Sequence, residues 1–547
     1  MRYLLPNRII RGVGVGATTA GNAQMRVPPD GIGIWFVSAF IGNDQSGDGS
    51  LGKPFATITK AQTVAIAGQL IHVLPGIYNE WLLGKDGLYY YFELGAKVIS
   101  SANGDNHLWY LPQQMSVWVG GYGEFIGNGT IRLQNDNSKF FMECLRLERP
   151  VTADFPCVSV VGGKLHLLVK DEIYCTNHYA VNIRNNSTAY IEVKKDITTV
   201  SPAGLGFNNC LNFTTVSNSE KSIIKARNIQ ILADDSLPAS NRNTGLFISS
   251  SPNASLQINA HMLYNSHIAV EEFNYNAAIN VDAGIKSLEV NAKVKSVGRF
   301  GIIATRGVAG SEIIINGDVE SQLNKAVVHS AANTRLVLHG KTTSYGRQTI
   351  ALGKSNYFAY QAGGTLEVNA PIYNRWNDIG GHGIVNYDGN LILNPSAAKI
   401  IVICPDAKSI YSPLMEKIIK VQGRIFASKD VGFLSKQEDQ VLINQVQNDT
   451  DYVVTINSIS VIYHSPMNGT TLMLIAAGVV AALNANSFPV TATDNLNGTY
   501  KIVGSTYGVS FTHIVSPNLT IIQKVLAGFN LINEITGGDI IYDENIG

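Results

Sequence analysis

Short stretches in which apolar and polar residues alternate recur through the middle of the chain. One begins at Leu165, another begins at Leu391, and seven more lie between them. The 226 residues from Leu165 to Leu391 divide into eight steps, with a mean of about 28 residues. Successive side chains of a strand point to opposite faces, so each stretch predicts a strand with one face buried and one exposed.

Two further short strands accompany each stretch. Residues 278–281 precede the stretch that begins at Leu288, and residues 292–296 follow it. Gly, Asn and Ser separate these strands, and no segment of helical period interrupts the run. The pattern predicts an all-β fold, a right-handed parallel β-helix with three short strands per coil, inward aliphatic ladders, and Asn and Gly at the turns. A propeller would need longer repeats with antiparallel turns, and a leucine-rich repeat would need helical halves.

Residues 35–80 carry the motifs KPFATI at 53–58 and IHVLPGIYNE at 71–80. This segment resembles the first segment of pectate-lyase-like β-helix proteins. The resemblance implies a short helix over about 57–67 that caps the open end of the solenoid. It concerns the fold and not an activity, because lyases, hydrolases and non-enzymatic phage spikes share the segment.

A different pattern follows near the end of the chain. Residues 451–515 read as β-β-α-β-β-β, in which the apolar stretch 472–484 has helical spacing and covers one face of the sheet. The motifs YVVTIN at 452–457 and VTATD at 490–494 make this segment similar to a small module common in bacteriophage tail proteins. Ser458 stands where that module usually has Gly. We expect the residues from Gly537 onward to be peripheral.

The chain therefore divides into four parts in sequence. They are an extended N-terminal arm that is a possible virion anchor (1–34), the β-helix with its capping helix (35–400), final coils with a cap and linker (401–448), and a small α+β module (449–547).

Composition narrows the possible partners and compartments. Lys and Arg number 41, as do Asp and Glu, so the chain has no net charge with which to attract nucleic acid or an anionic membrane. The longest strongly apolar run has 12 residues, which is too short to span a bilayer. We expect no signal peptide at the N-terminus. The five cysteines form no C-x-x-C pair, so buried reduced thiols are expected.

Candidate chemistry is sparse. Glycosidases need two carboxylates about 5–9.5 Å apart. Residues at i and i+2 of a strand share a face about 6.5–7 Å apart, so Asp318 and Glu320 are candidate catalytic residues. Asp234 and Asp235 are a second acidic pair. Outward acids on a solenoid also serve solubility alone. The scattered histidines do not have the spacing of a metal site, and no phosphate loop or nucleophile elbow is present, so no metal or cofactor is expected.

Aromatic residues are concentrated between residues 81 and 125. Exposed rings there could stack on sugars. We favour a second interpretation, in which consecutive rings are divided between the core and an oligomer interface.

These observations favour a virion structural protein, an external spike or fibre of a bacteriophage tail or head that attaches to the host surface. It would be assembled in the host cytoplasm. The resemblance implies a homotrimer. Other virion proteins would bind the arm or the C-terminal module, and a host-surface glycan is a further possible partner. The alternative is a tailspike depolymerase that cleaves a host-surface polysaccharide; we favour the role without catalysis.

Overall fold

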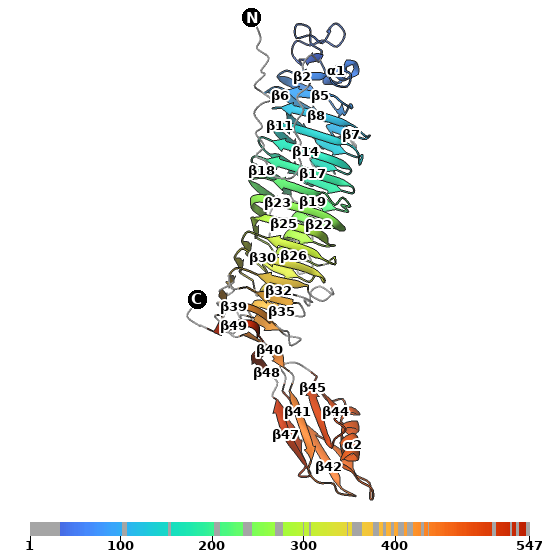
Figure 1. Ribbon diagram of the computed structural model, residues 1–547, viewed down its shortest axis with the longest axis vertical. Helices are drawn as coiled ribbons and strands as arrows, with labels where there is room; N and C mark the ends of the chain where they lie inside the picture. Colours follow the sequence, from blue (N-terminus) through green and yellow to red (C-terminus); the bar gives the residue numbers. More distant parts are fainter. Residues whose placement is uncertain are drawn as a thin grey trace. The chain divides into compact units, whose positions relative to one another are not determined.

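The computed structural model describes most of the chain beyond the first 32 residues. The described residues are 33–100, 107–150, 155–201, 208–233, 243–267, 277–298, 300–305, 308–346, 348–352, 364–375, 382–386, 390–394, 399–402, 410–412, 419–427, 431–435, 437–505, 510–525, 528–531 and 535–542. The chain forms two compact units, residues 1–376 and 377–547. The first unit is a stack of coils (Figure 1).

Most coils of the first unit contribute one strand to each of three parallel ladders. The first ladder comprises β1 (Ile34–Val37), β2 (Leu70–Val73), β5 (Tyr89–Phe92), β8 (Ser116–Gly121), β11 (Lys139–Cys144), β14 (Gly163–Val169), β17 (Ser187–Val193), β20 (Lys221–Lys225), the first parts of β23 (Ser251–Asn265) and β25 (Ile285–Ser296), β27 (Ser311–Ile315), β30 (Thr334–Leu338) and β33 (Thr365–Val368).

The second ladder comprises β3 (Gly76–Asn79), β6 (Ala96–Ser100), β9 (Glu124–Gly127), β12 (Arg146–Arg149), β15 (Ile173–Thr176), β18 (Asp196–Ser201), β21 (Asn228–Ala233), the last parts of β23 and β25, β28 (Val319–Ser321), β31 (Thr342–Ser344) and β34 (Ile372–Asn374). The third ladder comprises β4 (Leu82–Leu83), β7 (Trp109–Leu111), β10 (Ile131–Leu133), β13 (Val158–Val160), β16 (Val181–Arg184), β19 (Asn208–Thr214), β22 (Asn243–Ser249), β24 (Ala277–Val281), β26 (Phe300–Ala304), β29 (Val327–His329) and β32 (Gln348–Leu352).

Inward side chains stack in register from coil to coil and form the core. In the first ladder, Ile224 pairs with Ile258, and Ile258 pairs with Val290 on the next coil. The column of buried residues continues through neighbouring coils as Met142, Leu167, Ile191, Ile224, Ile258, Val290, Ile315, Leu338 and Val368. Alternation along each strand therefore becomes an aliphatic ladder, and the expected all-β parallel β-helix with three strands per coil is confirmed.

Asn and Gly occupy backbone conformations that other residues adopt poorly. Asn177 and Asn185 have φ values of 60° and 57°, in the left-handed region that Asn tolerates. Gly121 has φ 109°, and a Cβ added there would lie 2.0 Å from the carbonyl oxygen of Phe92 on the preceding coil. These residues thus allow tight turns between strands and, at Gly121, close contact between neighbouring coils.

The helix α1 (Ile58–Val64) lies next to β1 and β2 at the first coils. The Thr57 hydroxyl accepts a hydrogen bond from the Lys60 N–H at 3.1 Å and caps the helix. Asp44 accepts from the N–H groups of residues 56 and 57, and Glu80 accepts from those of residues 58 and 59. Ala65 is extended, so the helix is shorter than the expected 57–67.

The second unit begins with further strands, β35 (His382–Asn386), β36 (Asn390–Leu393), β37 (Lys399–Val402), β38 (Ile410–Ser412), β39 (Ile419–Ala427) and β40 (Val431–Ser435). Near the end of the chain, β48 (Gly528–Leu531) pairs antiparallel with β40, and β49 (Ile535–Tyr542) pairs in parallel with β39. For residues 537–542 the expectation of a peripheral segment is therefore wrong, because their backbone pairs with β39, more than 100 residues earlier in the chain.

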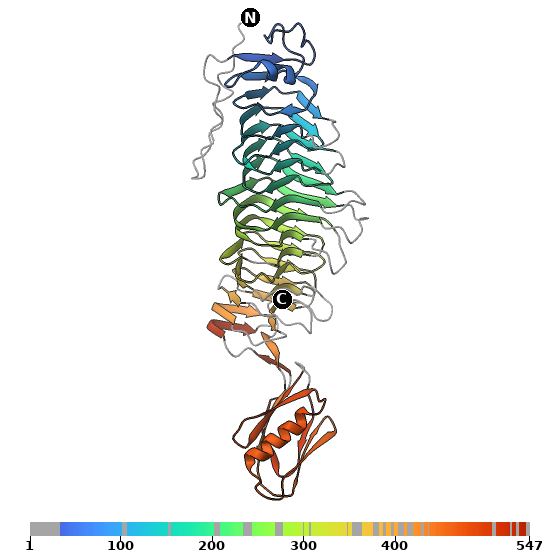
Figure 2. The ribbon, with the colours of Figure 1, turned by 90° about the vertical axis from the view of Figure 1, so that its right-hand side faces the viewer.

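In the sequence, a small α+β module lies between β40 and β48. Its helix packs against its own strands (Figure 2). It consists of β41 (Glu438–Ile443), β42 (Asp451–Ile456), β43 (Ile459–His464), α2 (Leu472–Asn484), β44 (Val490–Asp494), β45 (Thr499–Gly504), β46 (His513–Val515) and β47 (Leu519–Val525). Ile475, Val479 and Leu483 of α2 enter a core that includes Tyr452 and Tyr500. Their helical spacing explains why this apolar stretch forms a helix among strands.

Cys144, Cys157, Cys175 and Cys210 are buried free thiols, and Cys404 lies outside the described residues. Burial raises the pKa of the Cys157 and Cys210 thiols, which keeps them protonated. Across the described part of the chain, neither helix has the length and apolar character needed to cross a bilayer.

Candidate functional site

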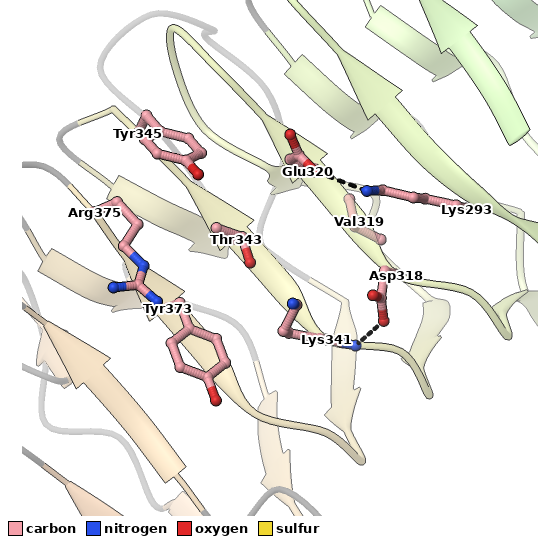
Figure 3. A pocket seen from close by; sticks show the side chains of 9 residues that line it. All are labelled: Lys293, Asp318, Val319, Glu320, Lys341, Thr343, Tyr345, Tyr373 and Arg375. Atoms are coloured by element: carbon pink, nitrogen blue, oxygen red, sulfur yellow. Dashed lines mark hydrogen bonds and ion pairs between the residues drawn. The ribbon is translucent and has the colours of Figure 1, made fainter. Parts of the chain in front are cut away.

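A hollow of about 240 Å³ opens on the outward face of the second ladder (Figure 3). Register places Lys295, Glu320, Thr343 and Tyr373 next to one another on four successive coils. The neighbours of these residues in each strand are buried; Val319, beside Glu320, is an example, although it still contributes to the floor of the hollow. The hollow is lined by Lys293, Asp318, Val319, Glu320, Lys341, Thr343, Tyr345, Tyr373 and Arg375.

Glu320 is held by two lysines. Its carboxylate lies 2.9 Å from the Lys293 ammonium and 3.2 Å from that of Lys295. Partial burial alone would raise the pKa of Glu320, but the hydrogen bonds and charges of the two lysines outweigh it and lower this pKa. Glu320 is therefore a carboxylate at neutral pH and has no proton to donate.

Asp318 lies in the same hollow, two residues before Glu320. Its Oδ1 atom accepts a hydrogen bond from the backbone N–H of Lys341 at 2.8 Å, which ties one coil to the next. The structure thus brings this candidate catalytic pair together, with both carboxylates engaged by neighbouring groups. Asp234 and Asp235, the other candidate pair, lie outside the described residues.

The far side of the hollow is cationic and aromatic. The Lys341 ammonium lies 5.8 Å from the centre of the Tyr373 ring, and the Arg375 guanidinium carbon lies 5.3 Å from it. Among the residues that the structure describes, neither cation forms an ion pair with a carboxylate. Tyr345 is exposed at the rim.

These cationic and aromatic residues were not predicted from the sequence. The pattern located the last strand of a coil only at 292–296 and around Asp318 and Glu320. On the next two coils, Lys341 directly precedes β31, Tyr373 lies in β34 and Arg375 directly follows β34. Placing each coil's last strand under the preceding one would have brought Glu320, Thr343 and Tyr373 into one column. The signal was present, but it depends on knowing the register.

A second, more open hollow of about 390 Å³ lies on the first ladder around Arg335. The Arg335 guanidinium contacts the carboxylates of both Glu312 and Glu367, one on each neighbouring coil. Its charge is therefore already neutralised, and the described lining of this hollow contains no other cation.

The aromatic residues near the start of the first unit are divided between core and surface. Tyr90 and Phe92 are buried, whereas Tyr89 and Tyr91 are only partly buried. On the outward face, five rings stack from coil to coil with centroids 4.8–5.9 Å apart: Tyr89, Trp118, Phe141, His166 and Tyr190. Neighbouring rings cover each other's faces, so this aromatic column presents ring edges to solvent and offers little flat surface for a sugar.

The described residues include no group of three or more His, Cys, Asp or Glu side chains that could hold a metal ion. His329 is buried, and its burial lowers its pKa to about 4. The described site chemistry is therefore that of carboxylates, amines, a guanidinium and phenols.

The fold and this hollow define a parallel β-helix protein with a cationic and aromatic site on its flank. A family model described as a protein of unknown function (DUF1565) matches residues 40–85. No curated protein matches the chain, and no solved structure matches it. The matched segment contains α1 and the residues that cap it, Asp44 and Glu80, so the match concerns the closed end of the β-helix and not the hollow.

Proposed function

We propose that this protein is an external spike or fibre of a bacteriophage particle, in the tail or the head, that takes part in attachment to the host surface. It would be made in the host cytoplasm and reside in the virion. A homotrimer is the proposed assembly. The arm 1–34 or the C-terminal module would bind other virion proteins.

The stack of coils supports this role. Each coil is joined to the next by three sets of parallel backbone hydrogen bonds, which makes a stiff and protease-resistant body suited to an appendage. The sequence similarity of residues 451–515 to a module of bacteriophage tail proteins points to the same class. A fold alone does not define a function, so the proposal also depends on the site.

The observation that favours attachment over cleavage is that Glu320 forms ion pairs with both Lys293 and Lys295. A glycosidase needs one carboxyl group that is protonated near its working pH. The lowered pKa of Glu320 opposes that role, and Asp318 is engaged in a backbone hydrogen bond. The hollow is suited to binding a ligand without transferring a proton to it.

Localisation tests the proposal directly. Particles purified from cells that carry this sequence would be labelled with an antibody against the chain and imaged by electron microscopy. We expect label at a fixed external position on the particle. Label confined to free protein or to cell debris would contradict the proposal.

The depolymerase alternative makes a separate prediction, because Asp318 and Glu320 do share the hollow. Host-surface polysaccharide would be incubated with the full chain, and released reducing ends or unsaturated products would be measured. Attachment without catalysis predicts an intact polymer. Product release that Glu320→Gln abolishes would establish the depolymerase instead.

Assembly can be measured on the isolated chain. Light scattering coupled to size exclusion would report a mass three times that of the 59.1 kDa chain for a homotrimer. The partly exposed aromatic column is our preferred contact surface, because apolar surface of this kind marks interaction sites. A monomer at micromolar concentration would contradict the proposed assembly.

A further inference from the structure

The hollow on the second ladder differs from the rest of the flank in how its charges are arranged. Elsewhere on this unit, a cation commonly meets an acid on an adjacent coil at 2.6–3.3 Å, as in Lys97–Glu124, Arg146–Glu172, Lys170–Glu143 and Arg227–Asp196. In the hollow, Lys341 and Arg375 meet the Tyr373 ring instead of a carboxylate. Among the described residues, Lys341 and Arg375 thus have no carboxylate partner, whereas Lys293 and Lys295 beside them share Glu320.

The local charge balance is positive. Three cationic side chains and two carboxylates line the hollow, which leaves an excess of one positive charge: Lys293, Lys341 and Arg375 against Asp318 and Glu320. Lys295, which pairs with Glu320 from beside the hollow, adds a second positive charge. Glu320 is already neutralised by its two lysines, and Asp318, which accepts a backbone N–H, is the one remaining negative charge beside Lys341 and Arg375. An incoming anion would therefore still meet an excess of positive charge at Lys341 and Arg375.

The geometry points to an acidic glycan as the ligand of this hollow: we propose that Lys341 and Arg375 bind the anionic group of a sugar, a carboxylate or a phosphate, beside Tyr345 and Tyr373. This inference rests on the proposed attachment function and names the chemical class of the receptor. A guanidinium matches the two oxygens of a carboxylate or phosphate, and an ammonium adds a point charge.

The rings supply the second element of recognition. Tyr345 is 46% exposed at the rim, next to the strand that carries Arg375, so its ring is available to the apolar face of a sugar. Figure 3 shows Tyr345 and Arg375 toward one end of the hollow and Lys341 toward the other, with Tyr373 between Arg375 and Lys341. A neutral sugar would gain only the ring contact, so the charge should decide which glycan binds.

The size of the hollow predicts weak binding at each site. Its volume of about 240 Å³ lies below the range of about 300–1,000 Å³ that is usual for small-molecule pockets. A polymer with repeated acidic units would bind several copies of the chain at once, and avidity would then raise the apparent affinity. Binding should also weaken as salt is added, because exposed charges are screened.

The experiment uses the full chain and three polymers, namely oligogalacturonate for the carboxylate, polyglycerol phosphate for the phosphate, and dextran as the neutral glycan. Binding would be followed by calorimetry at low and high salt. The variant Lys341→Ala/Arg375→Ala should lower the affinity for the acidic polymer by about tenfold or more, since each lost contact involves a charged group. Dextran binding, if measurable, should not change.

A matched control removes the same net charge elsewhere on the flank. Lys194 pairs with Glu192 and Lys195 pairs with Asp171, so Lys194→Ala/Lys195→Ala also deletes two cations but leaves the hollow intact. This control should bind acidic polymer as the unaltered chain does. Unchanged thermal midpoints in both variants would show that folding is preserved.

Both supporting outcomes require that the hollow variant loses binding while the control variant does not. If the lost binding is to oligogalacturonate, the recognised group is a carboxylate. If it is to polyglycerol phosphate, the recognised group is a phosphate. Equal loss in both double variants would overturn the site, because it would reflect net charge only. Binding of neither acidic polymer, or equal binding of dextran, would overturn the inference. Any of these failures leaves the labelling of the particle unaffected, so the two proposals can fail separately.

Discussion

Replacement of Ile258 by alanine should destabilise the first unit measurably. Ile258 is fully buried, and its register partners in the inward column are Ile224 and Val290. The change removes three carbon groups at about 0.8 kcal/mol each, or about 2.4 kcal/mol. The cavity left between two coils adds to this cost, within the range of about 2–5 kcal/mol seen for such replacements.

Gln257 provides the matched control, because it is the preceding residue of the same strand and points outward. Gln257→Ala should cost less than about 0.5 kcal/mol. Ile258→Val removes a single carbon group and should cost about 1 kcal/mol, between the other two.

Tryptophan fluorescence during urea unfolding is a suitable assay. All five tryptophans lie within residues 1–376, so the signal reports the first unit and not the C-terminal module. A loss of about 2.4 kcal/mol is roughly a 50-fold change in the unfolding constant and should lower the midpoint clearly. Equal midpoints for Ile258→Ala and Gln257→Ala would refute the reasoning, because they would show that the register does not bury residue 258.

Particular contacts support three further predictions. Thr471→Ala removes the hydroxyl that accepts the backbone N–H three residues on at 3.1 Å, and should lower the thermal midpoint of the module by an amount equivalent to about 1 kcal/mol. Gly121→Ala should destabilise the first unit by more than about 1 kcal/mol, since its Cβ would lie 2.0 Å from a backbone carbonyl; a fluorescence midpoint equal to that of the unaltered chain would contradict this. Hydrogen bonds that the His464 ring donates to the carboxylates of Asp451 first, and of Asp449 next, raise the pKa of His464 above its ordinary value of 6.5. The stabilisation is therefore present below about pH 6.5 and is lost as pH rises through the folded-state pKa, and an NMR titration should show Asp451→Asn lowering that pKa more than Asp449→Asn does.

Much of the fold follows from local patterns in the chain. Alternation around residues such as Leu288 and Leu336 predicts strands, and the recurrence of three strands per period predicts coils, because no other arrangement buries one face of each strand with local contacts. The helix over Leu472–Asn484 is predicted in the same way from its spacing. The end of the chain was not predictable, because pairing of β49 with β39 is a contact between segments distant in sequence.

The candidate site was likewise predictable only in part. Asp318 and Glu320 share one face because they are two residues apart in a single strand, and the sequence by itself determined this. The approach of Lys341 and Arg375 to Tyr373, and the clamp of Lys293 and Lys295 on Glu320, were decided only by the tertiary structure. They depend on which residues of successive coils lie side by side, and the variable length of each turn conceals that register until the coils are stacked.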